Sequence, residues 1–149
     1  MSLLRSINFA PIARLTVIWA LVFAAVHAYW ASGGAAGMNG EPADTAGAQG
    51  YIAFITVIGL LGAVVAHGLV PGSRGLLGHR RLVLLARAGG AALLAGVALG
   101  VSRWLADGSL NGDGAAGIIT TIYFLLGGLL FSRLGWADHA RSLSPATPR

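Results

Sequence analysis

The residues of this sequence that could do chemistry are few, and most are rings or cations set inside long apolar runs. His27 and His67 each lie near the end of such a run, and Arg87 is the charged residue set deepest in one. An ionisable group at membrane depth is costly and therefore points to a function. A histidine there can act as an axial ligand to a haem or pigment, or as a group that titrates near neutral pH.

The two histidines are expected near opposite membrane surfaces. At a helical rise of 1.5 Å per residue, His27 lies roughly 6 Å inside the outer end of its run, and His67 lies roughly 5 Å inside the inner end of the next. They cannot be the two axial ligands of one haem, which must lie at one level. For His27 we expect a hydrogen bond to a carbonyl or to Tyr123. Ligation of a small molecule, with Trp30 beside it, is the alternative.

A basic group is expected near the inner surface. Arg87 lies roughly 8 Å inside by helix rise, and its long side chain can extend to the headgroups. Together with His67, His79, Arg80 and Arg81 it forms a candidate pocket for an anionic lipid headgroup or a quinone oxygen. The simpler alternative is an arginine that reaches the headgroups and a histidine that only packs.

Several classes of chemistry are excluded by residue types that the chain lacks. It has no cysteine, and all ten basic residues are arginine, so thiol, iron–sulfur, Schiff-base and P-loop chemistry is ruled out. All five carboxylates are expected outside the helices, which argues against a proton-coupled transporter or an ion pump. No metal-binding or hydrolase motif occurs, so we expect neither a metal site nor an enzyme.

Four apolar segments have to position these side chains. Hydrophobic residues make up 56% of the 149 residues, only 10% are charged, and the mean hydropathy is +0.74, as in a membrane protein. Each segment is close to the roughly 20 residues that cross a bilayer as a helix. The sequence predicts one all-α membrane domain over 1–149, with four transmembrane helices in two hairpins at about 12–31, 51–70, 82–104 and 116–134 and a polar tail over 135–149.

The charges predict the orientation of these helices. Nearly all arginines outside the segments fall on the side of the two termini, whereas Glu41, Asp44, Asp107 and Asp113 fall on the other side. By the positive-inside rule both termini are cytoplasmic, and we expect a multi-pass protein of the bacterial cytoplasmic (inner) membrane. The pI near 11.1 then reflects cytoplasmic arginines, so no nucleic-acid partner is expected.

Small residues recur at helical spacing and are expected to form packing seams, because helices in lipid associate through close contact. Such stripes occur in the second and third segments, at Gly59 and Ala63 and at Ala88, Ala92, Gly96 and Gly100. We expect seams inside one bundle, and an oligomer interface is the alternative.

The aromatic residues divide into two groups by depth. Several are expected at the membrane interfaces, namely Tyr29, Trp30, Tyr51, Trp104 and Trp136. Others are expected at depth, where they face lipid, a partner or a pigment: Trp19, Phe54, Phe124 and Phe131.

Three stretches resemble a family of small bacterial four-helix integral membrane proteins that is known only as a domain of unknown function. They are HAYWASGG over 27–34, the pair Arg103-Trp104, and Thr121-Ile122-Tyr123 leading into Leu125-Leu126-Gly127. The resemblance implies four helices and a membrane location, and it implies no activity.

From these features we expect a small accessory or structural subunit of a larger bacterial membrane complex, with the lipid bilayer and other membrane subunits as partners. Catalytic groups are lacking, and little of the short chain lies outside the apolar segments. The alternative is a protein that holds a lipid, quinone, carotenoid or haem-type pigment between its helices. A third alternative is an oligomeric transporter of a neutral or anionic solute, with a path lined by Thr56, Ser102, Thr120, Thr121 and Tyr123.

Overall fold

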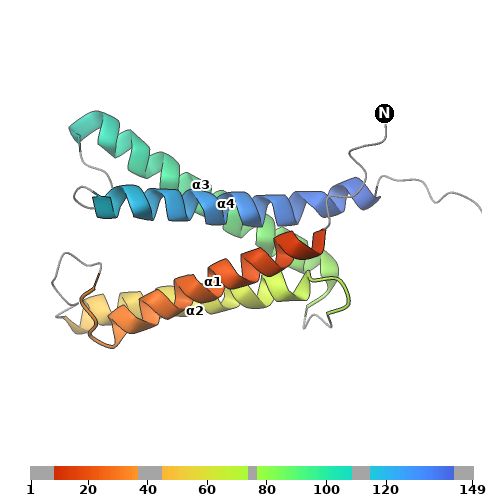
Figure 1. Ribbon diagram of the computed structural model, residues 1–149, viewed down its shortest axis with the longest axis horizontal. Coiled ribbons are helices and arrows are strands. Elements are labelled where there is room, and N and C mark those ends of the chain that lie inside the picture. Colours follow the sequence, from red (N-terminus) through yellow and green to blue (C-terminus); the bar gives the residue numbers. More distant parts are fainter. Residues whose placement is uncertain (1–8, 37–44, 74–76, 109–114, 143–149) are drawn as a thin grey trace, which may run out of the picture.

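The computed structural model describes residues 9–36, 45–73, 77–108 and 115–142, which form four helices (Figure 1). These are α1 (Phe9–Ala31), α2 (Ala46–Gly68), α3 (His79–Asp107) and α4 (Ala115–Ser142). Each is long and apolar enough to cross a membrane. The predicted all-α architecture with four membrane-spanning helices is confirmed, and the chain has the build of a multi-pass membrane protein.

The start of α2 and the end of α3 lie beyond their apolar segments, and at both places a cap rather than hydropathy sets the end of the helix. Thr45 precedes α2, and its side-chain oxygen accepts a hydrogen bond from the backbone N–H of Ala48 at 3.1 Å, so the helix begins five residues before the apolar run. At the end of α3, Gly108 takes a left-handed conformation with φ of 76°, and its N–H donates to the carbonyl of Trp104.

The end of α4 differs most from expectation. Residues 135–142, predicted to belong to a polar tail, continue α4 to Ser142. As a consequence Asp138 lies in α4. Asp107 is separately the last residue of α3, so the expectation that every carboxylate lies outside the helices is wrong. The four membrane-spanning stretches themselves, at 10–31, 46–68, 79–106 and 117–136, contain no Asp or Glu.

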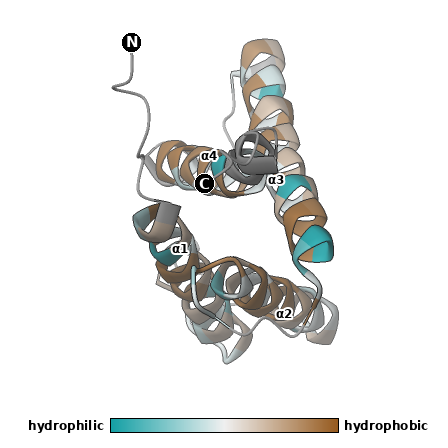
Figure 2. Ribbon diagram, turned by 90° about the vertical axis from the view of Figure 1, so that its right-hand side faces the viewer, coloured by the Kyte–Doolittle hydropathy of each residue, from teal (hydrophilic) through white to brown (hydrophobic). Residues whose placement is uncertain are grey.

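The bundle consists of two helical hairpins that meet along one line. α1 packs chiefly against α2, and α3 packs against α4. The hairpins join where α1 meets α4 and, somewhat less extensively, where α2 meets α3. α3 crosses α4 at an angle, so that its C-terminal part lies far from α1 and α2 (Figures 1 and 2). Many large apolar side chains of the helices are exposed, as a lipid surrounding requires, among them Leu15, Phe54, Leu84 and Leu129.

Glycines bring the backbones of each hairpin together. In the first hairpin, a Cβ added to Gly59 would lie 2.8 Å from a ring carbon of Phe23 and 3.2 Å from Ala24 Cβ, and Ala63 is buried one turn further along. In the second hairpin, a Cβ at Gly90 would meet the backbone N of Ser132 at 2.7 Å. Close contact of this kind is how helices associate in lipid.

The predicted stripe on α3 is not the seam with α4. Ala88, Ala92 and Gly96 are exposed, and no atom lies within 4 Å of the position of a Gly96 Cβ, whereas Gly100 is buried. The reason is geometric: a step of four residues overshoots a full turn by about 40°, so four such positions do not share one face. The seam follows steps of four and three instead, through Val83, Arg87, Gly90 and Leu94, which meet Gly135, Ser132 and Gly128 of α4.

Candidate ligand cleft between the first and last helices

Trp19 of α1 and Tyr123 of α4 hold the two hairpins together by a reciprocal pair of hydrogen bonds. The indole N–H of Trp19 donates to the backbone carbonyl of Tyr123 at 3.1 Å, and the Tyr123 hydroxyl donates to the backbone carbonyl of Trp19 at 2.8 Å. The two rings are stacked with their centroids 4.9 Å apart. Each residue therefore ties its side chain to the backbone of the other helix, which fixes both the spacing and the register of α1 and α4.

A glycine makes room for this contact. A Cβ at Gly127, one turn after Tyr123, would overlap the six-membered ring of Trp19. Phe131, one turn further, meets Trp19 edge to face at 6.0 Å. Trp19 is 7% exposed and Phe131 is 5% exposed, so both aromatic residues face the interior rather than lipid. Phe54, predicted at the same depth, is 60% exposed.

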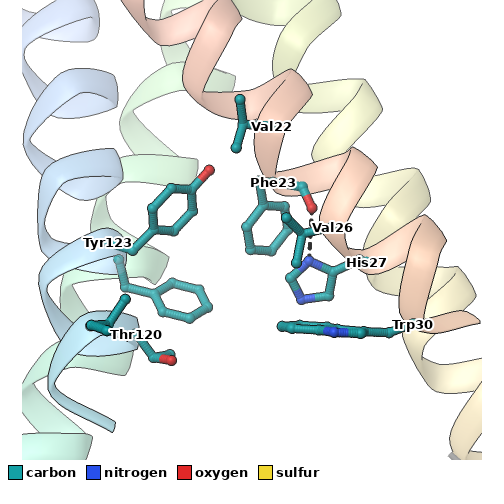
Figure 3. A pocket seen from close by; sticks show the side chains of 9 residues that line it. Val22, Phe23, Val26, His27, Trp30, Thr120 and Tyr123 are labelled. Atoms are coloured by element: carbon teal, nitrogen blue, oxygen red, sulfur yellow. Dashed lines mark hydrogen bonds between the residues drawn. The ribbon is translucent and has the colours of Figure 1, made fainter. Parts of the chain in front are cut away.

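An aromatic ladder continues from this pair along α1, with Phe23, His27 and Trp30 following Trp19. The rings of Phe23 and His27 are 4.1 Å apart, and those of His27 and Trp30 are 5.0 Å apart. The spacings of four, four and three residues put these rings on one face of the helix. Because this face turns toward α4, the ladder forms one wall of the space between the two helices (Figure 3).

This space is a cleft of about 330 Å³ at the end of the bundle where α1 ends and α4 begins. Its lining is mostly apolar and comes from two short stretches, Val22, Phe23, Val26, His27 and Trp30 of α1 and Ile119, Thr120, Tyr123 and Phe124 of α4. The cleft is open on one side, and Val22, Val26 and Ile119 at its edge are 39–66% exposed. Since both stretches lie in membrane-spanning parts of the chain, the opening faces the region that lipid chains would occupy.

His27 is the side chain in this cleft best suited to bind a polar atom. Its Nδ1 lies 2.8 Å from the backbone carbonyl of Phe23, and since a carbonyl only accepts, Nδ1 carries the hydrogen. In a neutral imidazole the other nitrogen, Nε2, is then an acceptor with a free lone pair. Nε2 lies on the side of the ring away from this carbonyl, toward the open cleft and above the indole of Trp30 (Figure 3).

Two other polar groups of the lining are already paired. The hydroxyl of Tyr123 donates to the carbonyl of Trp19 and points away from His27 (Figure 3). The indole N–H of Trp30 donates to the carbonyl of Ala36 at 2.7 Å, beyond the end of α1. Both donors are thus fixed by the protein itself. A ligand in the cleft would meet aromatic faces, aliphatic side chains, the hydroxyl of Thr120 and the acceptor nitrogen of His27.

The structure places the predicted site residues in two separate groups. His27, Trp30 and Tyr123 line one cleft, and of the two bonds expected for His27 the one observed goes to a carbonyl rather than to Tyr123. His67 is exposed near the C-terminal end of α2, at the end of the bundle opposite to His27. The two histidines are therefore far apart along the bundle, as the helix rise predicts. Sequence reasoning missed Phe23 as a member of the cleft, and the four-residue spacing to Trp19 and His27 was the available signal.

Arg87 makes contacts that the expected basic pocket did not include. Its Nε donates to the carbonyl of Gly135 at 3.0 Å, and its guanidinium lies 5.9 Å from the centre of the Trp136 ring. These two residues belong to the part of α4 that was predicted to be a tail. Arg87 therefore fastens α3 to the end of α4, and a role in holding an anionic headgroup with His67 stays a prediction.

A second, apolar cavity of about 270 Å³ lies between the two hairpins. It is lined by residues of all four helices, including Ile58, Gly62, Leu93 and Phe131. Phe23 and Phe124 line both this cavity and the cleft, and their rings meet edge to face at 5.8 Å. These two rings form the wall between the two spaces.

Within the described ranges, no three His, Asp or Glu side chains gather as they would around a metal ion. No family model matches the chain, and comparison with curated proteins and with solved structures finds no significant match. The resemblance of HAYWASGG to a family of four-helix membrane proteins consequently stays an expectation.

Proposed function

We propose that this protein is a small membrane protein that binds an apolar, ring-bearing molecule in the cleft between α1 and α4. The observation that carries the proposal is the lining: an aromatic wall with one fixed histidine whose Nε2 faces the space. Binding sites for small molecules are usually mostly apolar concavities with a few placed polar groups. The cleft fits that description.

The size of the cleft supports a ligand with one or two rings. An engineered apolar cavity of about 150 Å³ holds a benzene molecule, and this cleft has about 330 Å³. Its opening toward the lipid region leaves room for a tail. A molecule dissolved in the bilayer can therefore enter from the side, past the exposed side chains of Val26 and Ile119.

The proposal includes no catalysis by this chain. The membrane-spanning stretches hold no carboxylate, and the cleft offers a histidine, a threonine and a tyrosine whose hydroxyl is already bonded. General acid–base or nucleophilic catalysis needs a positioned group within reach of a second one. For location we propose a bacterial cytoplasmic membrane with both termini in the cytoplasm, on the strength of the arginine distribution.

The test is to block the cleft and measure what copurifies. Val26→Trp places a large ring at the edge of the cleft, and Val64→Trp makes the same exchange at an exposed position of α2 outside it. The proteins are purified in mild detergent, and organic extracts are analysed by mass spectrometry. We expect one ring-bearing lipid-soluble compound to be enriched with the wild type and with Val64→Trp, and lost with Val26→Trp. Equal extracts from all three proteins would refute the proposal.

A second candidate, an accessory subunit of a membrane complex, is supported by the surface of α3. The small residues Ala88, Ala92 and Gly96 are exposed, and Ala92 and Gly96 line the apolar cavity between the hairpins, where small residues allow close approach of another helix. Native mass spectrometry of gently solubilised membranes tests it. We expect a complex that Gly96→Leu disrupts, and a lone monomer for both proteins would count against a subunit role.

A further inference from the structure

We infer that the ligand of the cleft carries a ring hydroxyl that donates its hydrogen to Nε2 of His27, as a lipid-soluble quinol does. This inference rests on the proposed function and adds to it the chemical class of the ligand. The starting point is the bond from Nδ1 to the Phe23 carbonyl, which assigns the donor role to one nitrogen and the acceptor role to the other.

The assignment discriminates between the two oxidation states of a quinone. A quinol has hydroxyl groups and can donate a hydrogen to Nε2, whereas the oxidised quinone has only carbonyl acceptors. A carbonyl placed at Nε2 would face a lone pair and leave the desolvated nitrogen without a partner. The imidazole cannot turn to the other tautomer without giving up the bond to Phe23, because Nδ1 would then have no hydrogen to donate. Neutral His27 therefore selects the reduced form.

The other groups of the lining agree with this ligand. Phe23, Trp30 and Phe124 offer aromatic rings against which a flat ring can pack. The donors of Trp30 and Tyr123 are already bound to carbonyls, so they do not compete to bind a quinone oxygen. The hydroxyl of Thr120 can donate or accept, so it suits an oxygen of either oxidation state, and the discrimination comes from His27. The open side of the cleft lets an isoprenoid or alkyl tail extend into lipid between Val26 and Ile119.

A metal tetrapyrrole, which Nε2 could also ligate, exceeds the volume of the cleft and would have to extend through its open side. Scaling from the cavity of about 150 Å³ that holds one benzene ring, four rings would require roughly 600 Å³. The cleft provides about 330 Å³, and the Phe23–Phe124 contact closes it off from the second cavity. A single hydroxylated ring, or two fused rings, fits this volume.

The experiment compares decylubiquinol with decylubiquinone, which share ring, tail and shape and differ in the hydroxyl hydrogens. Dissociation constants are measured without oxygen, by native mass spectrometry on protein in lipid nanodiscs. We expect the quinol to bind roughly tenfold more tightly than the quinone, the upper range for one neutral hydrogen bond. His27→Phe should bind both probes with about equal affinity, because the nitrogen that favours the hydroxyl and penalises the carbonyl is gone, and binding of either probe shows that the variant is folded. His67→Phe, which replaces an exposed histidine outside the cleft, should keep the preference.

The failures of the two ideas are distinguishable. Equal binding of quinol and quinone to the wild type, unchanged in His27→Phe, would overturn the hydroxyl inference and leave the cleft as a binding site for rings. Binding of neither probe to the wild type would overturn the proposed function as well. A visible absorption band of a tetrapyrrole in the purified wild type, lost in His27→Phe, would replace the quinol with a metal-bound pigment.

Discussion

Replacing Gly127 by alanine should separate the two hairpins more than its single methyl group suggests. The added Cβ would overlap the ring of Trp19, so the indole has to move. The movement strains the packing of Trp19 against Phe131 and breaks the two hydrogen bonds between Trp19 and Tyr123. The fold would then lose the contact that sets the spacing of α1 and α4.

The magnitude follows from three contributions. Overpacking typically costs 1–3 kcal/mol, and each hydrogen bond between membrane helices contributes about 0.6 kcal/mol. The change from glycine to alanine in a helix returns about 0.5–1 kcal/mol. We therefore expect Gly127→Ala to lower the free energy of unfolding by about 2 kcal/mol.

The matched control is Gly96→Ala on α3. No atom lies within 4 Å of its Cβ position, and the residue is exposed, so only the helix-propensity gain applies. Unfolding is followed by tryptophan fluorescence and circular dichroism during titration of SDS into mixed micelles. We expect Gly96→Ala to equal or exceed the wild type in stability and Gly127→Ala to fall below it. Equal stability of the two variants would refute the placement of Trp19 over Gly127.

Three further predictions concern the Trp19–Tyr123 hydrogen bonds, the contact between α3 and α4, and the orientation of the chain in the membrane. Tyr123→Phe removes the hydrogen bond to the Trp19 carbonyl and leaves the one from the Trp19 indole, because each bond ends on a backbone carbonyl, and it should destabilise the protein by about 0.6–1.7 kcal/mol in the same SDS titration; wild-type stability of this variant would contradict the bond. Arg87→Met removes a charged donor and a cation–π contact and should destabilise the protein by about 1–2 kcal/mol in the same SDS titration; wild-type stability would contradict the contacts to α4. Because the chain has no cysteine, Ser32→Cys should react with an impermeant maleimide on intact cells and Ser73→Cys only after lysis; the opposite pattern would reverse the proposed orientation.

The helices could be predicted because length and hydropathy alone determine whether a segment can cross a bilayer. Their ends could not, because hydropathy reports the thickness of the apolar layer and not the position of a cap such as Thr45. The same limitation explains why residues 135–142 were predicted to be a tail. Gly135 and Trp136 follow the apolar run, yet they belong to α4 and contact Arg87. A sequence pattern does not contain that long-range contact.

The depth of the candidate site residues in the bundle could be predicted, but which of them meet could not. Helix rise gives depth, so the sequence placed His27 and Tyr123 in the same half of the bundle and His67 in the other. Rotation about the helix axis decides which side chains meet, and it depends on packing between helices that the sequence does not specify. Tyr123 therefore meets Trp19, which lies about two helical turns before the expected partner His27 on α1.

The most direct test of the ligand cleft is to detect which methyl groups of the protein touch a bound quinol. Methyl-labelled protein in nanodiscs is studied by NMR with unlabelled decylubiquinol, and intermolecular NOEs are recorded. Our account predicts NOEs from the quinol ring to methyl groups of Val26 and Thr120 in the cleft and their loss in His27→Phe. Ring NOEs spread evenly over exposed methyl groups such as those of Leu99 and Leu105, unchanged in that variant, would contradict it.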